Sequence, residues 1–500
     1  MTITATRPGH VLNPRAFFIG GDWVEPSAST TFDVVDSATE EVFLTVAEAQ
    51  APDIERAVAA ARAAFDAGPW PRMSPAERGV WLRKIADAWE TRGEKLADTW
   101  ALESGVLRTM GVHSAKGVAE VFRYYASLGD TFAWEEKHTS SMGQPALLVR
   151  EPVGVVAAII PWNAPHSLMA YKVAAALIAG CTVIIKASPE APASPYFMAE
   201  VCKEVGLPAG VVNVLTAERE VSELLVRNPG VDKVSFTGST AAGRKIASIC
   251  GERIARVTLE LGGKSPALIL DDYDLGKAAA SIARTAPLMT GQVCASLTRI
   301  IVGEQRHDEF VDALVAAFDQ IKVGDPFDAA SQMGPLAMER QRDRVEGFIA
   351  QGKADGARLA AGGGRPSHLN RGYFIEPTVF ANVDNCSVIA REEIFGPVVS
   401  VIPAASEQQA IEIANDSIYG LNASVFTSDP DHAYAVGRQL RSGTVGHNGF
   451  KTEFGIAFGG FKQSGIGREG GVEGLHPYLE TKTMVFETAP MAAQQGNEAS

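Results

Sequence analysis

The chain has 500 residues and a formal net charge of −14, with 46% hydrophobic and 21% charged residues. One compact core does not accommodate a chain of this length, so we expect two or three domains of an ordinary globular protein. The acidic balance argues against nucleic-acid or anionic-membrane binding, because both need a basic surface.

The longest apolar stretch, Val153 to Ile160, ends at Pro161 and is far shorter than the ~20 residues of a membrane-spanning helix. The N-terminal segment MTITATRPGHVLNPRAFF has no apolar core after a basic start, which argues against a signal peptide. We therefore expect a cytoplasmic protein with no membrane partner.

The first 130 residues predict short strands followed by helices. The strand-like runs are 17–19 and 31–35. Apolar residues at three- and four-residue spacing predict helices over 54–65, 76–96 and 113–128. The next segment, 131–151, predicts irregular structure that ends in a strand over 146–150.

From residue 153 onward, strands and helices alternate in two series. The first has the runs VGVVAAII, TVIIKA, VVNVL, VDKVSF and ARVTLEL, with helices over 167–179, 194–204, 220–227 and 241–250. The second has PALIL, RIIV, SVIP, ASVFT and GTVGHN, with helices over 274–286, 307–320, 407–415 and 431–440. Apolar runs between helices are typical of parallel strands covered on both faces, so we expect an α/β fold with two open, doubly wound domains.

A glycine-rich turn, Gly238 to Gly243, lies between VDKVSF and a helix. Glycines at such a turn let the backbone approach a pyrophosphate, and the helix N-terminus supplies free N–H groups. Thr240 stands where the second glycine of the ordinary dinucleotide motif would be. The turn alone is therefore equally explained as a plain strand–helix connection.

Two polar residues follow predicted strands, at the edge where open α/β sheets bind ligands. Asn163, in PWNAP, offers two N–H donors for an oxyanion, although it also fits a simple turn between prolines. Glu260, in ELGGK, is a candidate general base, although it also fits a turn carboxylate paired with Lys264.

The five cysteines include no C-x-x-C pair, which is typical of reduced thiols rather than of a disulfide framework or a zinc site, and we expect no metal. Cys294, in GQVC, is the candidate nucleophile. The other four fit structural positions in or beside helices or in a loop: Cys181, Cys202, Cys250 and Cys386.

These motifs, in this order and on this alternation, resemble those of the aldehyde dehydrogenase superfamily. The likeness continues through EEIFGP at 392–397, FGGFKQSG at 458–465 and GRE at 467–469, and it covers roughly residues 15 to 487. It implies a Rossmann-like NAD(P)-binding domain (1–130 and 151–262), a catalytic domain (263–470), a β oligomerisation arm (131–150 and 471–490) and a disordered tail (491–500).

The resemblance also implies a homo-oligomer, either a dimer or a tetramer. In this interpretation the arm combines the segment before residue 151 with the C-terminal strand. The apolar strand 484–486 has no obvious partner inside its own monomer, which an assembly through the arm would explain.

The activity implied by the resemblance is oxidation of an aldehyde to a carboxylic acid through a thioester. Cys294 attacks the carbonyl, the Asn163 amide holds the oxyanion, and hydride leaves to the nicotinamide. Glu260 activates the water that hydrolyses the thioester. Lys172 and Glu469 match positions that relay protons from Glu260.

The expected cofactor is NAD, with NADP as the alternative. Ser239 and Trp162 match pyrophosphate contacts, Glu393 a nicotinamide-ribose contact, and Lys186 an adenosine-ribose contact. The best-known NAD pattern has Glu three residues after this lysine, where this chain has Pro189 and then Glu190. The other positions expected at the cofactor are Ile159, Pro161, Ser188, Phe236, Gly238, Leu261, Gly262 and Phe395.

Two other classes are compatible with this fold. A CoA-acylating relative would release the thioester to CoA and would lack Glu260, and a non-enzymatic relative such as a lens crystallin would lack Cys294 or Asn163. All three residues are present, which favours the hydrolytic enzyme. NADH formation with and without CoA separates the three classes.

The residues expected to line the aldehyde tunnel predict an apolar or aromatic substrate. No arginine or lysine other than Lys172 lies within 162–172 or 286–298, so the carboxylate of a semialdehyde would be buried without a cation. His166 is interpreted as an ordinary loop histidine. The expected tunnel residues are Ala164, Leu168, Met169, Tyr171, Val293, Ala295 and Phe458.

Overall fold

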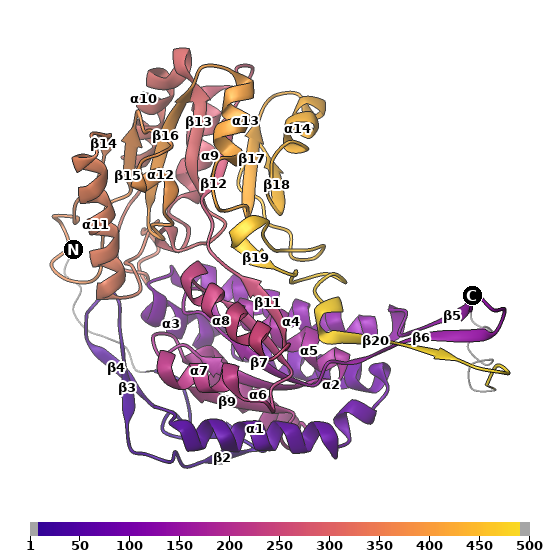
Figure 1. The fold of residues 1–500 in the computed structure, drawn as a ribbon. Coiled ribbons are helices and arrows are strands. Elements are labelled where there is room, and N and C mark those ends of the chain that lie inside the picture. The colour runs from indigo at the N-terminus through magenta and orange to yellow at the C-terminus, as the bar shows by residue number, and fades with distance from the viewer. Residues whose placement is uncertain (1–8, 491–500) are drawn as a thin grey trace.

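The computed structural model describes residues 9–490. The predicted disordered tail and the first eight residues of the segment examined for a signal peptide lie outside the described residues. Figure 1 shows two lobes and a thin arm of strands that projects away from them. Each lobe is built on one large sheet, as the α/β alternation predicts. Within 9–490, no helix is long and apolar enough to cross a membrane.

The first sheet has eight strands in the order β19-β11-β10-β7-β8-β9-β1-β2, and its five central strands are parallel. Strands β7 to β10 are buried along their whole length, which explains their mostly apolar sequences. The strands are β1 (Phe17–Ile19), β2 (Asp22–Val24), β7 (Val155–Ile159), β8 (Thr182–Ala187), β9 (Val212–Thr216), β10 (Lys233–Thr237), β11 (Arg256–Glu260) and β19 (Gly465–Ile466).

Helices cover both faces of this sheet and bury it in two apolar cores. On one face lie α5 (Pro165–Ala179) and α6 (Ala193–Val205), backed by α2 (Pro75–Glu90), α3 (Gly93–Ser104) and α4 (Arg108–Thr131). On the other lie α1 (Ala51–Asp66), α7 (Arg219–Arg227) and α8 (Thr240–Glu252). The doubly wound prediction is confirmed for this lobe.

The second sheet has seven strands in the order β14-β15-β16-β13-β12-β17-β18, and all but β14 are parallel. The strands are β12 (Ser265–Ile269), β13 (Leu297–Gly303), β14 (Arg358–Ala361), β15 (Thr378–Ala381), β16 (Val398–Ala404), β17 (Asn422–Phe426) and β18 (Thr444–His447). One face carries α9 (Leu275–Thr285) and α10 (His307–Phe318), and the other carries α11 (Glu339–Ala354), α12 (Val388–Arg391), α13 (Glu407–Asn415) and α14 (Pro430–Gly437).

Several elements differ from the sequence predictions. The single helix predicted over 76–96 is two helices, since α2 ends at Glu90 and α3 begins at Gly93. Helix α11 was not predicted, because its sequence, ERQRDRVEGFIAQGKA, carries few apolar residues and so shows no helical periodicity of apolar positions. The further elements that the prediction missed are β2, β14, β15, α12 and β4 (Val42–Ala47), which pairs with β3 (Thr31–Val35).

The arm is a three-stranded sheet in the order β20-β6-β5. The prediction of irregular structure is wrong for β5 (Glu135–Thr139), whose exposed polar sequence EEKHT gives no apolar alternation. Strand β20 (Leu479–Val485) pairs with β6 (Pro145–Pro152) along its whole length. The interpretation that the C-terminal strand lacks a partner in its own chain is therefore wrong, because pairing across more than 300 residues leaves no local signal.

Candidate active site

The loops after β7 and β10 meet where the strand order of the first sheet reverses. From β7 the chain proceeds to β8 and β9 on one side, and then to β10 and β11 on the other. Open α/β sheets bind ligands in the crevice at this point. The turns at Trp162–Asn163 and Gly238–Ser239 therefore lie beside the same crevice.

The glycine turn is built for a close approach. Ser239 caps α8, and its hydroxyl accepts a hydrogen bond from the Ala242 N–H at 3.3 Å. A Cβ on Gly238 would lie 2.5 Å from the Phe236 ring, and a Cβ on Gly262 would lie 2.4 Å from the Glu393 carboxylate. A side chain at either position would displace Phe236 or Glu393, and the bare backbone beside a helix N-terminus fits a phosphate group.

Two residues of the second lobe contact the loops of the first. Glu393 lies against Gly262 and Gly263, and Phe395 lies against Trp162. The Glu393 carboxylate accepts a hydrogen bond from the Gly263 N–H at 3.1 Å, and burial raises the pKa of Glu393 to about 7. Phe395 has a left-handed backbone (φ 61°), and its ring lies edge-on to Trp162 at 5.3 Å. The carbonyl of Phe395 accepts a hydrogen bond from the Gln341 side chain at 2.7 Å, which fixes the turn.

The predicted adenosine-ribose contact Lys186 is the next-to-last residue of strand β8, and Ser188 and Glu190 follow the strand. Burial lowers the pKa of Lys186 to about 8. The Glu190 carboxylate accepts a hydrogen bond from Ser188 and forms an ion pair with Arg340 at the start of α11. Sequence reasoning missed Arg340, because 150 residues separate it from Glu190 and α11 was not predicted.

The loop that carries Cys294 is strained. Met289, Thr290 and Gly291 all have left-handed backbones, with φ of 49°, 56° and 71°. The two non-glycine residues, Met289 and Thr290, cost of order 1–3 kcal/mol each and persist only where the surroundings hold them. The Thr290 hydroxyl donates to backbone carbonyls of 334–335 at 3.0 Å. The loop is thus held in one shape ahead of β13.

Cys294 is half-buried, and its surroundings oppose ionisation. Burial, and then the carboxylates of Glu393 and Glu260, raise the pKa of the thiol to about 12. The Asn163 amide donates one N–H to the Gln292 carbonyl at 2.9 Å and has a second N–H to donate. The thiol is therefore neutral at pH 7 in this state, and attack on a carbonyl needs a base to take its proton.

Glu260 ends β11 and is only 2% exposed. Neither of its carboxylate oxygens has a hydrogen-bond partner among the described residues. Burial, and then the carboxylate of Glu469, raise the pKa of Glu260. A Cβ on Gly459 would lie 2.7 Å from Glu260 Oε1, and Glu260 pairs with Gly465 of β19. The C-terminal motif therefore packs directly against the candidate base.

Lys172 and Glu469 form a buried ion pair beside Glu260. Lys172 Nζ donates to the Glu469 carboxylate and, at 2.7 Å, to the Thr237 hydroxyl. Glu469 also exchanges two backbone hydrogen bonds with Phe458, each 2.7 Å long. Phe458, whose ring is expected to line the aldehyde tunnel, is thus hydrogen-bonded through its backbone to the candidate relay residue Glu469.

The buried pair gives a stability prediction. Lys172→Met leaves the Glu469 carboxylate buried without its cation, and we expect a loss of ~3–5 kcal/mol in the free energy of unfolding. Urea unfolding followed by circular dichroism measures it. Lys172→Met/Glu469→Gln removes both charges and should recover most of the loss. A single variant as stable as wild type would contradict the prediction.

Most of the predicted tunnel residues gather around an aromatic stack. The rings of Tyr171, Phe454 and Phe458 stack in sequence, with centroids 4.5 and 4.0 Å apart and interplanar angles of 20° and 15°. Val293 and Ala295 belong to the same apolar cluster as Phe458. Sequence reasoning missed Phe454, although the spacing F-x-x-x-F in FGIAF was available.

Three further predicted residues lie on or before α5, and one histidine differs from its prediction. Ala164 caps the helix, Leu168 is nearly buried, and Met169 belongs to the core of the first lobe and not to the aromatic cluster. His166 is not in a loop, because α5 begins at Pro165. It is completely buried, its Nε2 lies 2.6 Å from the Ser114 hydroxyl, and burial lowers its pKa to about 3.

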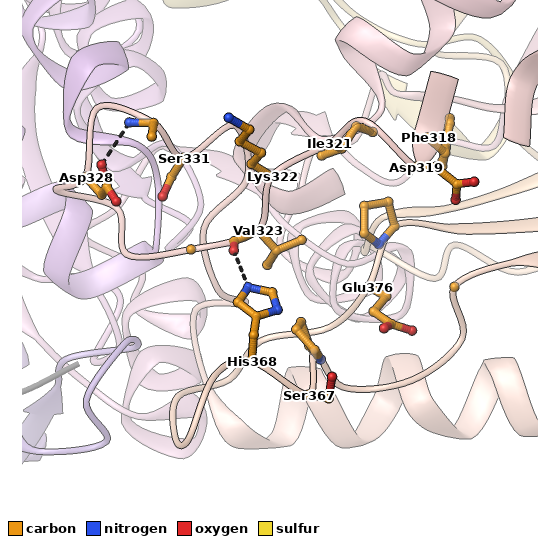
Figure 2. Close-up of a pocket in the computed structure, with 15 residues that line it drawn as sticks. Phe318, Asp319, Ile321, Lys322, Val323, Asp328, Ser331, Ser367, His368 and Glu376 are labelled. Carbon is orange, nitrogen blue, oxygen red and sulfur yellow. Dashed lines mark hydrogen bonds between the residues drawn. The ribbon is translucent and has the colours of Figure 1, made fainter. Parts of the chain in front are cut away.

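A separate surface pocket of about 530 Å³ lies on the second lobe. Figure 2 shows it at the end of α10, with the His368 ring nitrogen bonded to the Val323 carbonyl at 3.0 Å. None of the predicted site residues is among its lining residues. We place the candidate active site at the crevice between the lobes and not in this pocket.

Two open α/β lobes that bring together a half-buried thiol, a buried carboxylate and an amide donor fit the class of nucleotide-dependent oxidoreductases. The family model described as "Aldehyde dehydrogenase family" matches residues 23–484. The chain belongs to this family, whose members oxidise aldehydes.

Individual relatives match along their whole length. A geranial dehydrogenase of Castellaniella defragrans is 45% identical over 474 residues, which is 95% of this chain and 99% of that protein. A betaine aldehyde dehydrogenase of Brucella canis is 41% identical over 479 residues, covering 95% and 98%. The crystal structure of a Mycobacterium tuberculosis aldehyde dehydrogenase complexed with NAD+ is 43% identical, with a TM-score of 0.93 and coverage of 97% and 100%.

Proposed function

We propose that this protein oxidises an apolar aldehyde to a carboxylic acid, with NAD as the hydride acceptor and a thioester on Cys294. The observation that carries the proposal is the contact between the two motifs: a Cβ on Gly263, in ELGGK, would lie 2.3 Å from the Cys294 carbonyl oxygen. The segments that carry the candidate base and the candidate nucleophile therefore touch, which supports the proposal. The experiment that tests it is NADH formation from an aldehyde, stoichiometric with acid and independent of CoA.

The chemistry follows from the side chains. Glu260, whose carboxylate raises the thiol pKa, takes the Cys294 proton as the sulfur bonds to the carbonyl carbon. The second Asn163 N–H and the backbone N–H of Cys294 stabilise the oxyanion. NAD, when bound, accepts the hydride. The Lys172–Glu469 pair carries away the proton taken from Cys294, so Glu260 is again a carboxylate. Glu260 then removes a proton from the water that attacks the thioester, and this proton passes to the Cys294 sulfur as it leaves, which regenerates the thiol.

The residues around the crevice fit NAD. Ser239, Gly238 and the α8 N-terminus would hold the pyrophosphate, Glu393 the nicotinamide ribose and Lys186 the adenosine ribose. The other expected contacts Ile159, Pro161, Leu261 and Gly262 lie at or directly after the ends of β7 and β11, which supports the same assignment. A solved relative is complexed with NAD+, which supports this choice.

Glu190 is the basis for a cofactor prediction. Its carboxylate lies within electrostatic reach of Lys186, and it would repel a 2′-phosphate. We expect kcat/KM to be higher with NAD than with NADP. Glu190→Gln should raise the relative use of NADP by about tenfold, equivalent to ~1.4 kcal/mol, because Arg340 loses its carboxylate partner. Arg340→Gln is the matched control and should not favour NADP. A wild-type preference for NADP would contradict the assignment.

The aromatic stack favours an uncharged substrate. The rings of Tyr171 and Phe458 cover the two faces of the Phe454 ring. The three rings therefore do not surround a space in which a quaternary ammonium group would contact several ring faces. Arg468, the cation nearest Glu260 besides Lys172, donates to the carbonyls of Gly460 and Gly467. The stacked rings themselves offer a substrate carboxylate no cation. The geranial dehydrogenase relative supports this choice.

A substrate panel tests it. We expect kcat/KM for geranial, octanal or benzaldehyde to exceed that for succinic semialdehyde by at least ~10²-fold, because burying an unpaired carboxylate costs several kcal/mol. Betaine aldehyde, which carries a quaternary ammonium, should also be poor. A higher kcat/KM for succinic semialdehyde would overturn the assignment.

The larger organisation is part of the same proposal. The division into a cofactor domain, a catalytic domain and an arm is supported by the two sheets and the β20-β6-β5 sheet. The arm projects from the lobes, and its outer strands β20 and β5 each have one edge without a partner strand among residues 9–490. Such edges suit a dimer or tetramer of identical subunits. The proposed compartment is the cytoplasm.

A further inference from the structure

The segment that carries Asn163 is held from outside by the end of another helix. Asn163 lies between β7 and α5, and Ala164 after it is not helical (φ −137°, ψ 59°), so no helical ladder fixes its direction. The Asn163 carbonyl accepts a hydrogen bond from the Trp100 indole Nε1–H at 2.9 Å. The Trp162 carbonyl accepts one from the Ser104 hydroxyl at 2.8 Å. Both donors lie in the last two turns of α3.

Trp100 itself has little freedom. Its side chain is 4% exposed, and its ring lies edge-on to His166 with centroids 4.5 Å apart and an interplanar angle of 78°. His166 is in turn bonded to Ser114 of α4. The indole N–H is therefore held by α4 and α5 in the direction of the Asn163 carbonyl.

The other end of Asn163 is tied to the thiol loop. Its amide donates to the Gln292 carbonyl at 2.9 Å, two residues before Cys294. The Gln292 side chain accepts from the Ala337 N–H and donates to the Met289 carbonyl, both at 3.0 Å. Asn163 thus spans α3 and the thiol loop, and a shift of its backbone would turn the remaining amide N–H.

We propose that Trp100 is a positioning residue for the reaction: its N–H fixes the backbone of Asn163 and so directs the Asn163 amide at the oxyanion. This inference rests on the proposed function, because the oxyanion role of Asn163 belongs to that proposal. Donors of this kind act only when they are held close to the productive geometry, so a small shift lowers the rate.

Trp100→Phe removes the N–H and keeps an aromatic ring against His166. We expect kcat to fall about tenfold, the effect of losing roughly one hydrogen bond, with KM for the aldehyde and Kd for NAD unchanged. Trp89→Phe is the matched control, because Trp89 is fully buried and its Nε1 has no partner in the described part of the chain. It should retain wild-type kcat. Ser104→Ala is a smaller second variant with a loss in the same direction.

A double-mutant cycle separates positioning from general damage. Asn163→Ala should be slow, and adding Trp100→Phe to it should cause no further loss. Full additivity, or a Trp100→Phe rate equal to that of Trp89→Phe, would overturn the inference and leave the proposed function standing. An Asn163→Ala variant with wild-type kcat would instead overturn the oxyanion role itself.

Discussion

Cys294→Ser should lower kcat by at least ~10³-fold, because a serine hydroxyl is a much weaker acid and nucleophile than a thiol, even with Glu260 nearby. The surroundings already oppose ionisation of the more acidic thiol, whose pKa burial raises to about 12. The substitution is nearly isosteric, and Cys294 makes none of the proposed cofactor contacts. We therefore expect the Kd for NAD, measured by calorimetry, to stay unchanged.

Two other cysteines are controls for this prediction. Cys386→Ser changes the exposed thiol, and Cys250→Ala changes a buried thiol of the first lobe. Both should keep kcat near that of wild type. Wild-type turnover in Cys294→Ser, or loss of turnover only in Cys250→Ala, would show that the nucleophile is assigned to the wrong residue.

Glu260→Gln should slow hydrolysis of the thioester more than its formation, because water is a weaker acid than a thiol and depends more on a base. We therefore expect a burst of about one NADH per site followed by turnover that is ~10²–10⁴-fold slower. Stopped-flow absorbance of NADH measures both phases. If Glu260 mainly takes the thiol proton, the first turnover will be as slow as the later ones. That absence of a burst would assign Glu260 to the first step alone.

The same residue predicts the acid limb of the pH profile. Glu260 acts as the carboxylate, and burial and Glu469 raise its pKa above the usual value of 4.5. Wild-type kcat should therefore fall as the pH drops through this raised pKa, and it should recover as the pH rises. The limb should disappear in Glu260→Gln. A limb that persists unchanged would belong to another group.

The candidate site was predicted best where each residue sits at the end of a strand or in a short motif. Asn163 follows β7 and Glu260 ends β11, as the apolar runs before them indicate. Long-range partners left no such signal. Arg340 reaches Glu190 from 150 residues away, and Trp100 reaches Asn163 from the part of α3 that lies beyond the helix predicted over 76–96.

The sequence by itself determined the α/β alternation, the family resemblance and the identities of the candidate nucleophile, base and amide donor. These depend on local periodicity and on residues close together in the chain. Only the tertiary structure decided the partner of β20, the burial of His166 and the stack of Tyr171, Phe454 and Phe458. Each depends on which segments pack against one another in the folded chain. That is set by packing over hundreds of residues, which periodicity does not record.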